Sequence, residues 1–459
     1  MKELSDLRRA AREIFSEALK SVDAGRAVRR AVELDGSRLR LVDTTFDLAA
    51  QHSEIYVIAI GKAALSMVVA LNEILGERLS AGVITGPSIS QYKMSRSDGA
   101  AAEFSERWRV FAGGHPLPND ASLAAARAAF DLLQQADSSG ALVIFLISGG
   151  GSAMIEWPND ASITLEELRA ANRVLVSCGA SIKEINAVRR AFSAVKGGRL
   201  AARAPHARQV SLIVSDTNAG EEAYVASGPT FESPDELDAA SIVSRYELAA
   251  RLPSSILRAI NETRSVKSET PRQLVGQHYV LLDSGHAIAA AASAARMRGF
   301  HLEVAHDLIE QQITEGSAQL ASRLYALSHR RKAFERAVCL IAGGEFACPV
   351  RGSGTGGRNS ETALRCAIEW DTRLKSNPLE QASHMVCLSA GTDGIDGNSP
   401  AAGAIADETT LARARAAGLD ARSFLNRSDA YTFFDHLGDT IMTGPTGTNV
   451  RDLRIMLAG

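Results

Sequence analysis

One pattern, repeated along the chain, limits the fold more than any other feature. Short apolar runs end in Gly, Ser or Asp turns and lead into alanine-rich stretches with helical spacing. Three examples are EIYVIAIGKAALSMVVALNEIL (54–75), ALVIFLISGGGSAM (141–154) and QVSLIVSDTNAG (209–220). This alternation predicts an α/β protein with largely parallel sheets.

Two polar stretches interrupt the pattern and mark a domain boundary. They are SGPTFESPDELD (227–238) and NETRSVKSETPRQ (261–273). We therefore expect one α/β domain over residues 1–240 and a second over 270–459. The second domain opens with a strand, a helix that ends at Gly299 and another strand, which predicts one βαβ unit over 278–307.

Charge and hydropathy narrow the class of partner. The 459 residues carry a formal net charge of −3, so the chain lacks the basic field that would attract nucleic acid or an anionic membrane. The longest apolar run, ALVIFLI (141–147), is far too short to cross a bilayer. Small molecules are therefore the expected partners.

The N-terminus and the cysteines indicate the compartment. LRRAAREIFSEALK (7–20) carries charges at helical spacing and lacks the apolar core of a signal peptide, so we expect an amphipathic helix there. The five cysteines include no C-x-x-C pair and lie in apolar segments, which predicts reduced thiols. Both features favour a cytoplasmic protein.

Candidate functional residues follow the apolar runs, because ligands bind beyond the carboxyl ends of parallel strands. The turn after ALVIFLI offers consecutive glycine N–H groups that an anion can approach closely. Three adjacent glycines cost about 0.5–1 kcal/mol each in chain entropy, which favours function over a plain turn. The residues are Ser148, Gly149, Gly150, Gly151 and Ser152.

Two segments place cations near such turns. Lys62 directly follows a strand at the start of a helix, where an ammonium group suits a phosphate, and only nine of the 50 basic residues are lysines. NAVRRAFSAVKGGRLA (186–201) predicts a helix with Arg189 and Lys196 on one face, able to clamp a carboxylate or phosphate. Solvated surface charges are the alternative for all three residues.

Carboxylates also follow strands. Asp216 ends VSLIVSD, and Asp393 lies in GTDGIDG after another apolar run. Carboxylates at strand ends opposite phosphate loops are typical Mg²⁺ ligands, whereas an Asp beside Gly is also a common turn residue.

RGSGTGGRNSET (351–362) resembles two phosphate-binding motifs and satisfies neither. A dinucleotide fingerprint needs a robust strand before Gly352, and FACPVR is short and contains a proline. A P-loop needs Lys-Ser/Thr where this chain has Arg358-Asn359. What remains is a glycine-rich nest that leads into a helix N-terminus, with Arg358 able to grip an oxyanion.

Several of these motifs, in this order, resemble the MOFRL-type glycerate 2-kinases. They are LISGGGSAM, INAVRRAFSAVKGGRLA, VSD…ASGPT, GGRNSE, GTDGIDG…AAGA and TGPTGTNVRDL. The resemblance implies a Rossmann-like N-terminal α/β domain, a C-terminal α/β (MOFRL) domain and an active site in the cleft between them.

The resemblance also implies a reaction and its residues. Phosphorylation of D-glycerate to 2-phosphoglycerate would use ATP and Mg²⁺, with a homodimer as one option for the oligomeric state. Lys62, Arg189 and Asp216 would be catalytic, and Asp216 and Asp393 would hold the metal. The glycine turn Ser148–Ser152 and Lys196 would bind substrate or nucleotide, together with Gly354, Gly356, Gly357, Arg358, Asn359 and Glu361.

The chain departs from the family pattern inside the motifs. Gly220 and Glu221 stand at two usually acidic positions, and Ala191, Ser360 and Pro400 replace a usual His, Gln and Asp. We therefore expect that D-glycerate need not be the best substrate. Two other functions stay open: an NAD(P)H-dependent hydroxypyruvate reductase, and a degenerate kinase that serves as a ligand-binding module.

Overall fold

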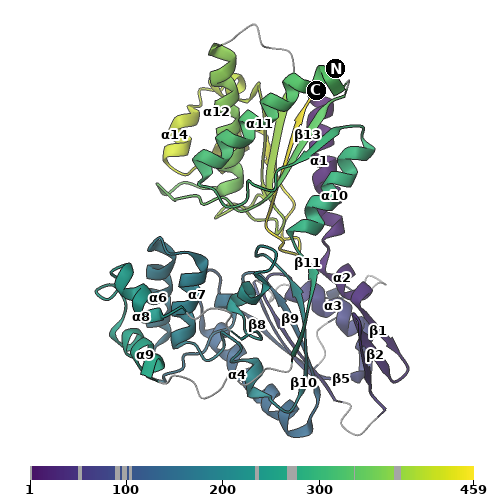
Figure 1. The fold of residues 1–459 in the computed structure, drawn as a ribbon, viewed down its shortest axis with the longest axis vertical. Coiled ribbons are helices and arrows are strands. Elements are labelled where there is room, and N and C mark those ends of the chain that lie inside the picture. Colours follow the sequence, from purple (N-terminus) through teal and green to yellow (C-terminus); the bar gives the residue numbers. More distant parts are fainter. Residues whose placement is uncertain are drawn as a thin grey trace. The chain divides into compact units, whose positions relative to one another are not determined.

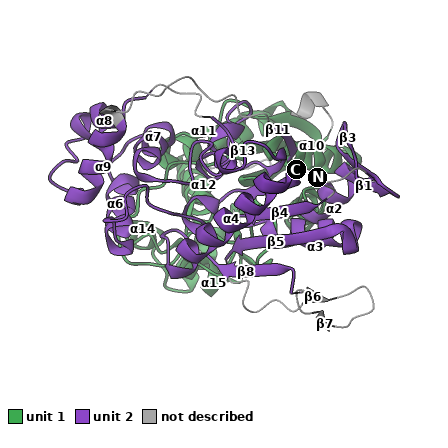
Figure 2. Cartoon of the chain, turned by 90° about the horizontal axis from the view of Figure 1, so that it is seen from below, with its two compact units in different colours: residues 1–23, 282–459 green, residues 24–281 purple. Residues whose placement is uncertain are grey.

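The computed structural model describes residues 3–49, 54–87, 94–95, 101–102, 106–232, 237–265, 276–334, 336–376 and 384–459. The chain divides into two compact units (Figures 1 and 2). Unit 2 comprises residues 24–281, and unit 1 comprises residues 1–23 together with 282–459. In the described part of the chain, no helix is both long enough and apolar enough to span a membrane.

Unit 2 is built around a six-stranded sheet of order β11-β10-β9-β4-β5-β8. The five strands from β10 to β8 pair in parallel, and β4 and β9 are buried along their whole length. The strands are β4 (Ile55–Ile60), β5 (Leu79–Gly86), β8 (Trp108–Ala112), β9 (Leu142–Ser148), β10 (Arg208–Val214) and β11 (Gly276–Leu282). Parallel strands buried on both faces explain the continuous apolar runs of the sequence.

Helices and two small sheets complete unit 2. The helices are α2 (Ala24–Ala31), α3 (Ala64–Leu75), α4 (Asp120–Ser139), α5 (Gly151–Met154), α6 (Leu165–Ser177), α7 (Ile182–Phe192), α8 (Ala239–Arg245) and α9 (Ser254–Ser265), with 3-10 turns at Gly76–Arg78, Ala201–Arg203 and Glu222–Ser227. Helices α6 to α9 share a hydrophobic cluster of their own. The small sheets are β1 (Val32–Asp35), β2 (Arg38–Leu41) and β3 (Thr44–Asp47), and β6 (Met94–Ser95) with β7 (Ala101–Ala102).

Unit 1 contains a second six-stranded sheet, of order β12-β13-β17-β14-β15-β16. One face packs against α1 and α10, and the other packs against α11 and α12. The strands are β12 (His301–Val304), β13 (Val338–Gly344), β14 (Met385–Gly391), β15 (Gly403–Asp407), β16 (Thr440–Ile441) and β17 (Asp452–Ala458). The helices are α1 (Leu4–Ser21), α10 (Ser284–Met297), α11 (Ile313–Phe334), α12 (Arg358–Ser376), α13 (Thr410–Ala416), α14 (Ala421–Asn426) and α15 (Ala430–Leu437).

The α/β class and the N-terminal helix are confirmed, whereas the expectation of largely parallel sheets holds only for unit 2. In unit 1 the strand β17 lies between β13 and β14 and pairs antiparallel with both, and β15 and β16 continue antiparallel. The predicted βαβ unit over 278–307 is wrong, because β11 joins the sheet of unit 2 and β12 joins that of unit 1.

The units also differ from the residue ranges 1–240 and 270–459 expected from the sequence. Helix α1 groups with the C-terminal half of the chain, and the boundary falls at residue 281. Leu7, Ile14 and Phe15 of α1 are buried in the same cluster as residues of α10, β14 and β17. The apolar face of this helix therefore joins a core built by residues far along the chain.

Candidate active site

Three neighbouring strands of unit 2 end level with one another at one edge of the sheet. Ile60 of β4 pairs with Ile147 of β9, and Val214 of β10 pairs with Ser148. Because β9 lies between β4 and β10, Lys62 and Asp216 follow the strands on either side of the glycine turn. The chain continues from β4 to β5 on one side and returns at β9 on the other, so the turn lies at the switch point where such sheets bind ligands.

Ser148 fixes the start of this turn. Its Oγ accepts a hydrogen bond from the N–H of Ala63 at 2.9 Å and donates to the carbonyl of Ile60 at 3.2 Å. Gly61 has φ +111°, and a Cβ there would lie 2.3 Å from the carbonyl oxygen of Ser148. Ser148 is fully buried, so it positions the backbone on which Lys62 stands.

The glycine turn presents backbone donors. The N–H groups of Gly149, Gly150, Gly151 and Ser152 donate to no acceptor in the described ranges. Gly150 has φ +79°, and a Cβ there would lie 3.1 Å from Cε of Lys62. Successive N–H groups around a left-handed residue make an anion-binding concavity, and the Lys62 stem lies against it.

A buried ion pair supports the far side of the turn. The ammonium of Lys196 pairs with Glu156 and donates to the carbonyl of Ser152 at 2.9 Å, while the Oγ of Ser193 donates to Glu156 at 2.6 Å. Lys196 is 1% exposed, and burial lowers its pKa while the Glu156 carboxylate opposes that shift. Lys196 therefore stabilises the glycine turn through its hydrogen bond to the Ser152 carbonyl.

Arg189 and Lys196 do not share a helix face, and that expectation is wrong. Helix α7 ends at Phe192, and Ser193 is extended with ψ 137°. The Oγ of Ser193 accepts from the N–H groups of Val195 and Lys196 at 3.2 and 3.3 Å, which stabilises a turn in place of another helical turn.

Arg189 nevertheless lies near this ion pair. Burial lowers its pKa, and the charge of Glu156 raises it. Its Nε is buried and makes no hydrogen bond within the described residues. A buried donor of this kind suits a substrate oxyanion, because an unsatisfied buried polar group is costly.

A chain of hydroxyl groups borders the turn as well. Ser152 Oγ lies 2.7 Å from Ser227 Oγ, which also donates to Asn186 Oδ1 at 2.9 Å. Ala226 and Ser227 have φ values of +52° and +64°. Two consecutive non-glycine residues in the left-handed region store strain, a feature common at functional sites.

Asp216 is the metal candidate of unit 2, and Asp393 that of unit 1. Asp216 is partly exposed two residues beyond β10. Asp393 accepts the N–H of Ile395 at 3.1 Å. The described residues contain no cluster of three His, Cys, Asp or Glu that could hold a metal. Mg²⁺ often needs only one or two carboxylates plus phosphate oxygens, and Asp216 fits that mode.

The glycine-rich segment of unit 1 satisfies its own donors. The N–H groups of Gly354, Thr355, Gly356 and Gly357 donate to Arg427 O, Asp429 Oδ1, Asn398 Oδ1 and Ser360 Oγ respectively. At the start of α12 the N–H groups of Asn359 and Ser360 donate to the buried Asp396 at 2.9 and 2.8 Å. The anion at this helix N-terminus is therefore a carboxylate of the chain itself.

Arg358 belongs to the same network. Its Nε donates to Asp452 at 2.6 Å, and its Nη2 pairs with Glu345 at 2.6 Å. Burial lowers the pKa of Arg358, but the two carboxylates raise it by more than burial lowers it, so the net shift is upward. Asn359 also donates to Asp452, at 2.8 Å.

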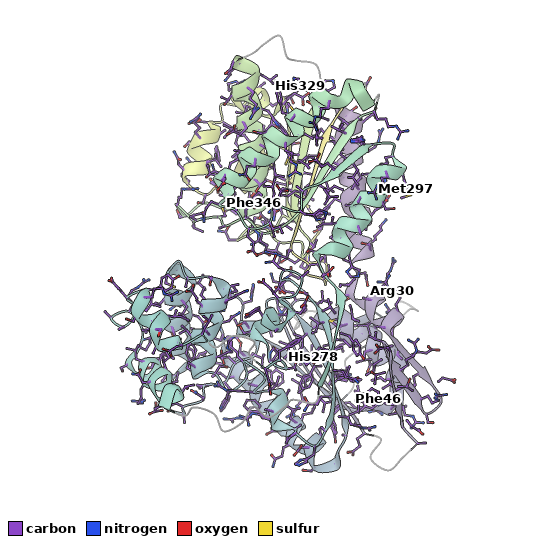
Figure 3. The ribbon with its side chains drawn as sticks, viewed as in Figure 1. Arg30, Phe46, His278, Met297, His329 and Phe346 are labelled. Atoms are coloured by element: carbon purple, nitrogen blue, oxygen red, sulfur yellow. The ribbon has the colours of Figure 1, made fainter. Side chains whose placement is uncertain are left out.

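Glu361, the last candidate in this segment, pairs with Arg351 and Arg365. A pocket of about 370 Å³ borders these residues, and its lining includes Gly354, Gly357, Arg358 and Phe346. Figure 3 labels Phe346 among the side chains of the molecule. The segment thus adjoins a cavity although its backbone donors are engaged.

Sequence reasoning missed Glu156, Asn186, Ser227 and Asp452. Glu156 gave the clearest signal, because it interrupts the apolar stretch AMIEWP and a charge in such a stretch needs a partner. Asn186 and Ser227 lie inside quoted motifs without any chemical feature that sets them apart.

The chain matches two protein families. The family described as "Domain of unknown function (DUF4147)" matches residues 10–261, and the MOFRL family matches residues 338–452. A D-glycerate 2-kinase from Thermotoga maritima is 32% identical over 98% of both chains. A human glycerate kinase is 33% identical over 97% of this chain and 92% of its own.

Structure and sequence agree on this relationship. A solved glycerate kinase structure from Thermotoga maritima superposes with a TM-score of 0.75 at 31% identity, covering 99% of this chain and 100% of that one. A protein from Agrobacterium vitis with the provisional name hydroxypyruvate reductase is 35% identical over 88% of this chain and 99% of its own. The chain therefore belongs to the MOFRL family of glycerate kinases.

Proposed function

We propose that this chain transfers the γ-phosphoryl group of ATP to the 2-hydroxyl of D-glycerate, which gives 2-phosphoglycerate and ADP. The observation that carries the proposal is the glycine turn at the switch point, with four N–H groups directed to no acceptor in the described ranges and Lys62 packed against it. Full-length relatives named glycerate 2-kinase and glycerate kinase support the choice of reaction.

Phosphoryl transfer needs positioning and neutralisation of charge more than covalent chemistry. The N–H groups of Gly149 to Ser152 receive phosphate oxygens, and the Lys62 ammonium stabilises the charge on the transferring group. Arg189, with its buried Nε, binds the carboxylate of the acceptor. Lys196, which remains a proposed binding residue, and Glu156 also hold the turn in place.

Mg²⁺ would neutralise the phosphate charge of ATP, with Asp216 as its ligand in unit 2. Asp393 remains a proposed metal ligand of unit 1. The proposed substrate- or nucleotide-binding residues of unit 1 remain Gly354, Gly356, Gly357, Arg358, Asn359 and Glu361. Because their segment satisfies its own backbone donors, we assign the phosphates to the turn of unit 2. The cytoplasmic location and the homodimer stay predictions.

An ADP-release assay over a panel of three- and four-carbon hydroxy acids tests the reaction. We expect turnover with D-glycerate, and a better acid in the panel would show that Gly220, Glu221 and Ala191 changed the preference. The same protein incubated with NADH and hydroxypyruvate should oxidise no NADH. Binding of ATP without turnover of any acid would contradict the proposal and favour a ligand-binding module.

Lys62 gives the sharpest test of the site. Lys62→Ala should lower kcat by roughly 10²–10³, as the loss of one preorganised donor to the transition state does. Lys62→Arg should not restore the rate, because a planar guanidinium directs its donors differently. Lys20→Ala, at an exposed position of α1, is the control and should leave kcat unchanged. Equal rates in all four proteins would exclude Lys62 from catalysis.

A further inference from the structure

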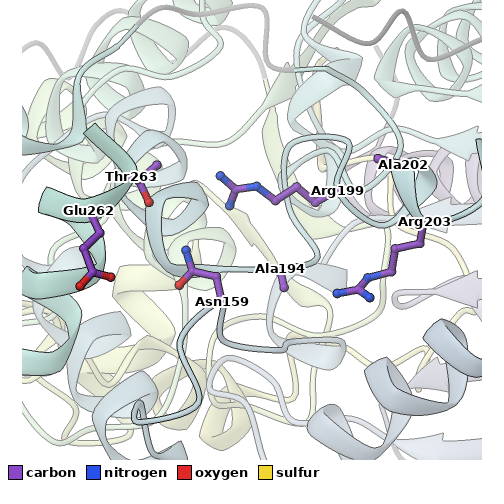
Figure 4. A pocket seen from close by; sticks show the side chains of 7 residues that line it. All are labelled: Asn159, Ala194, Arg199, Ala202, Arg203, Glu262 and Thr263. Atoms are coloured by element: carbon purple, nitrogen blue, oxygen red, sulfur yellow. The ribbon is translucent and has the colours of Figure 1, made fainter. Parts of the chain in front are cut away.

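Unit 2 contains a pocket that the proposed reaction does not use. Its volume is about 500 Å³, and it is lined by Asn159, Arg199, Arg203, Glu262 and Thr263 together with alanines (Figure 4). We call it the Arg199 pocket. Its lining includes neither Lys62 nor a residue of the glycine turn.

Arg199 is fixed at one wall of this pocket. Its Nη1 donates to the carbonyl oxygens of Arg190, in the last turn of α7, and of Ser193, the residue that follows this helix. Its Nε and Nη2 make no hydrogen bond with any described residue. Burial lowers the pKa of Arg199 and the charge of Arg190 lowers it further, while the more distant Glu156 carboxylate, which pairs with Lys196, opposes part of this shift.

Arg203 supplies a second cation. Its guanidinium carbon lies 3.5 Å from the centre of the Phe130 ring, which covers one face of the group. Within the described residues, Arg203 forms neither a salt bridge nor a hydrogen bond through its side chain. Figure 4 shows both guanidinium groups directed toward the side of the pocket where Asn159 and Thr263 lie.

The opposite wall is held by hydrogen bonds. Asn159 Nδ2 and Thr263 Oγ1 both donate to the carbonyl of Ala191, at 2.9 and 2.7 Å. Asn159 keeps a second amide hydrogen for a ligand. Glu262 is the acid of the lining and pairs with neither arginine.

We propose that the Arg199 pocket is a second anion site, which binds the phosphate group of a small molecule. Two positioned guanidinium groups without carboxylate partners match the charge of a phosphate dianion, and each can donate two hydrogen bonds to it. The pocket can hold a phosphate with a small organic substituent. The proposal does not depend on the kinase reaction.

Calorimetric titration of the full chain with inorganic phosphate at low ionic strength tests the site. We expect Arg203→Gln to weaken this binding about tenfold or more, because a charge-assisted hydrogen bond is lost. Lys62→Ala should retain the binding that depends on Arg203. A parallel titration with 2-phosphoglycerate distinguishes a phosphate ester from free phosphate as the preferred occupant.

Arg208→Gln is the matched control. Arg208 is also exposed and also stacks on a phenylalanine, at 5.6 Å from the Phe46 ring, but it does not line the pocket. It should leave phosphate affinity unchanged. Equal losses of phosphate affinity in Arg203→Gln and Arg208→Gln would show that only the net charge of the protein matters. Complete loss of phosphate binding in Lys62→Ala would show that all the phosphate binds at the glycine turn. Either result overturns the proposal.

Discussion

For single residues, the candidate site depends on left-handed backbone conformations, which glycine adopts more readily than other residues. Gly150 combines a left-handed φ with close contact to Lys62, so a side chain there is excluded twice. Gly140, the C-cap of α4, has φ +61° but nothing within 4 Å of a Cβ. Substitutions at the two glycines therefore distinguish backbone strain, expected at both positions, from displacement of the Lys62 side chain, expected only at Gly150.

Gly150→Ala should reduce kcat strongly, because the new methyl group displaces the Lys62 stem and changes the anion cradle. Gly140→Ala should lower the free energy of unfolding by about 1 kcal/mol or more, as alanine does at a left-handed position, and leave kcat unchanged. Steady-state kinetics and urea unfolding of both variants provide the comparison. Similar kcat values in the two would show that Gly150 serves only the turn.

The buried Asp452 gives a prediction of pH dependence. Burial raises its pKa, but the charge of Arg358 lowers it by more, so the net shift is downward from the ordinary value of 3.8. The stabilisation from the carboxylate is thus present above pH 3.8 and is lost as the pH falls through its folded pKa.

Asp452→Asn should cost about 3–5 kcal/mol at pH 7, because it leaves Arg358 and Arg454 without their buried partner. The difference in free energy of unfolding between Asp452→Asn and the wild type should become smaller below pH 3.8, the ordinary pKa of an aspartate. Asp131→Asn breaks an exposed pair with Arg109 and should cost less than about 1 kcal/mol. Unfolding curves at several pH values measure both, and a constant difference across pH would contradict the assignment.

At the scale of elements, α1 shows how a helix at one end of the chain completes a core at the other. Its buried face contacts α10, β14 and β17, and Arg8 pairs with Asp407 and Asp439. The helix therefore contributes to the stability of unit 1.

Ile14→Ala should destabilise unit 1 by about 2–5 kcal/mol, since Ile14 is fully buried. Hydrogen exchange should become faster in β14 and β17 and stay unchanged in β9 of unit 2. Ser16→Ala, on the exposed face of the same helix, should change neither. Faster exchange confined to β9 would be inconsistent with the packing of α1.

At the scale of the whole molecule, activity should require Mg²⁺ or Mn²⁺. The negative charge of the ATP phosphates must be neutralised during transfer, and the four N–H groups and the Lys62 ammonium neutralise only part of it. Chelator should abolish turnover, and either metal should restore it. Asp216→Asn should raise the metal concentration needed for half-maximal rate, whereas full activity in excess chelator would refute the prediction.

Local sequence patterns were sufficient to locate the strands and turns around the candidate site. Continuous apolar runs predicted β4, β9, β10 and β14, because a strand covered on both faces is apolar along its whole length and can be recognised without knowing its partners. The glycines and Lys62 were found for the same reason: they directly follow those runs. The parallel pairing of β4, β9 and β10 then brings the turns that follow these strands to one edge of the sheet.

The strand order of unit 1 and its buried ion pairs could not be found in this way, because strand partners and charge partners come from distant segments of the chain. Strand β17 contains two charged residues, Asp452 and Arg454, and both are buried between β13 and β14. Asp452 pairs with Arg358, and Arg454 donates to the carbonyls of Gly343 and Gly344. The glycine-rich segment suggested an anion site at the N-terminus of α12, but there Asp396 accepts the N–H groups of Asn359 and Ser360. No local pattern specifies which carboxylate reaches a buried cation or helix end, since that depends on how the chain folds back.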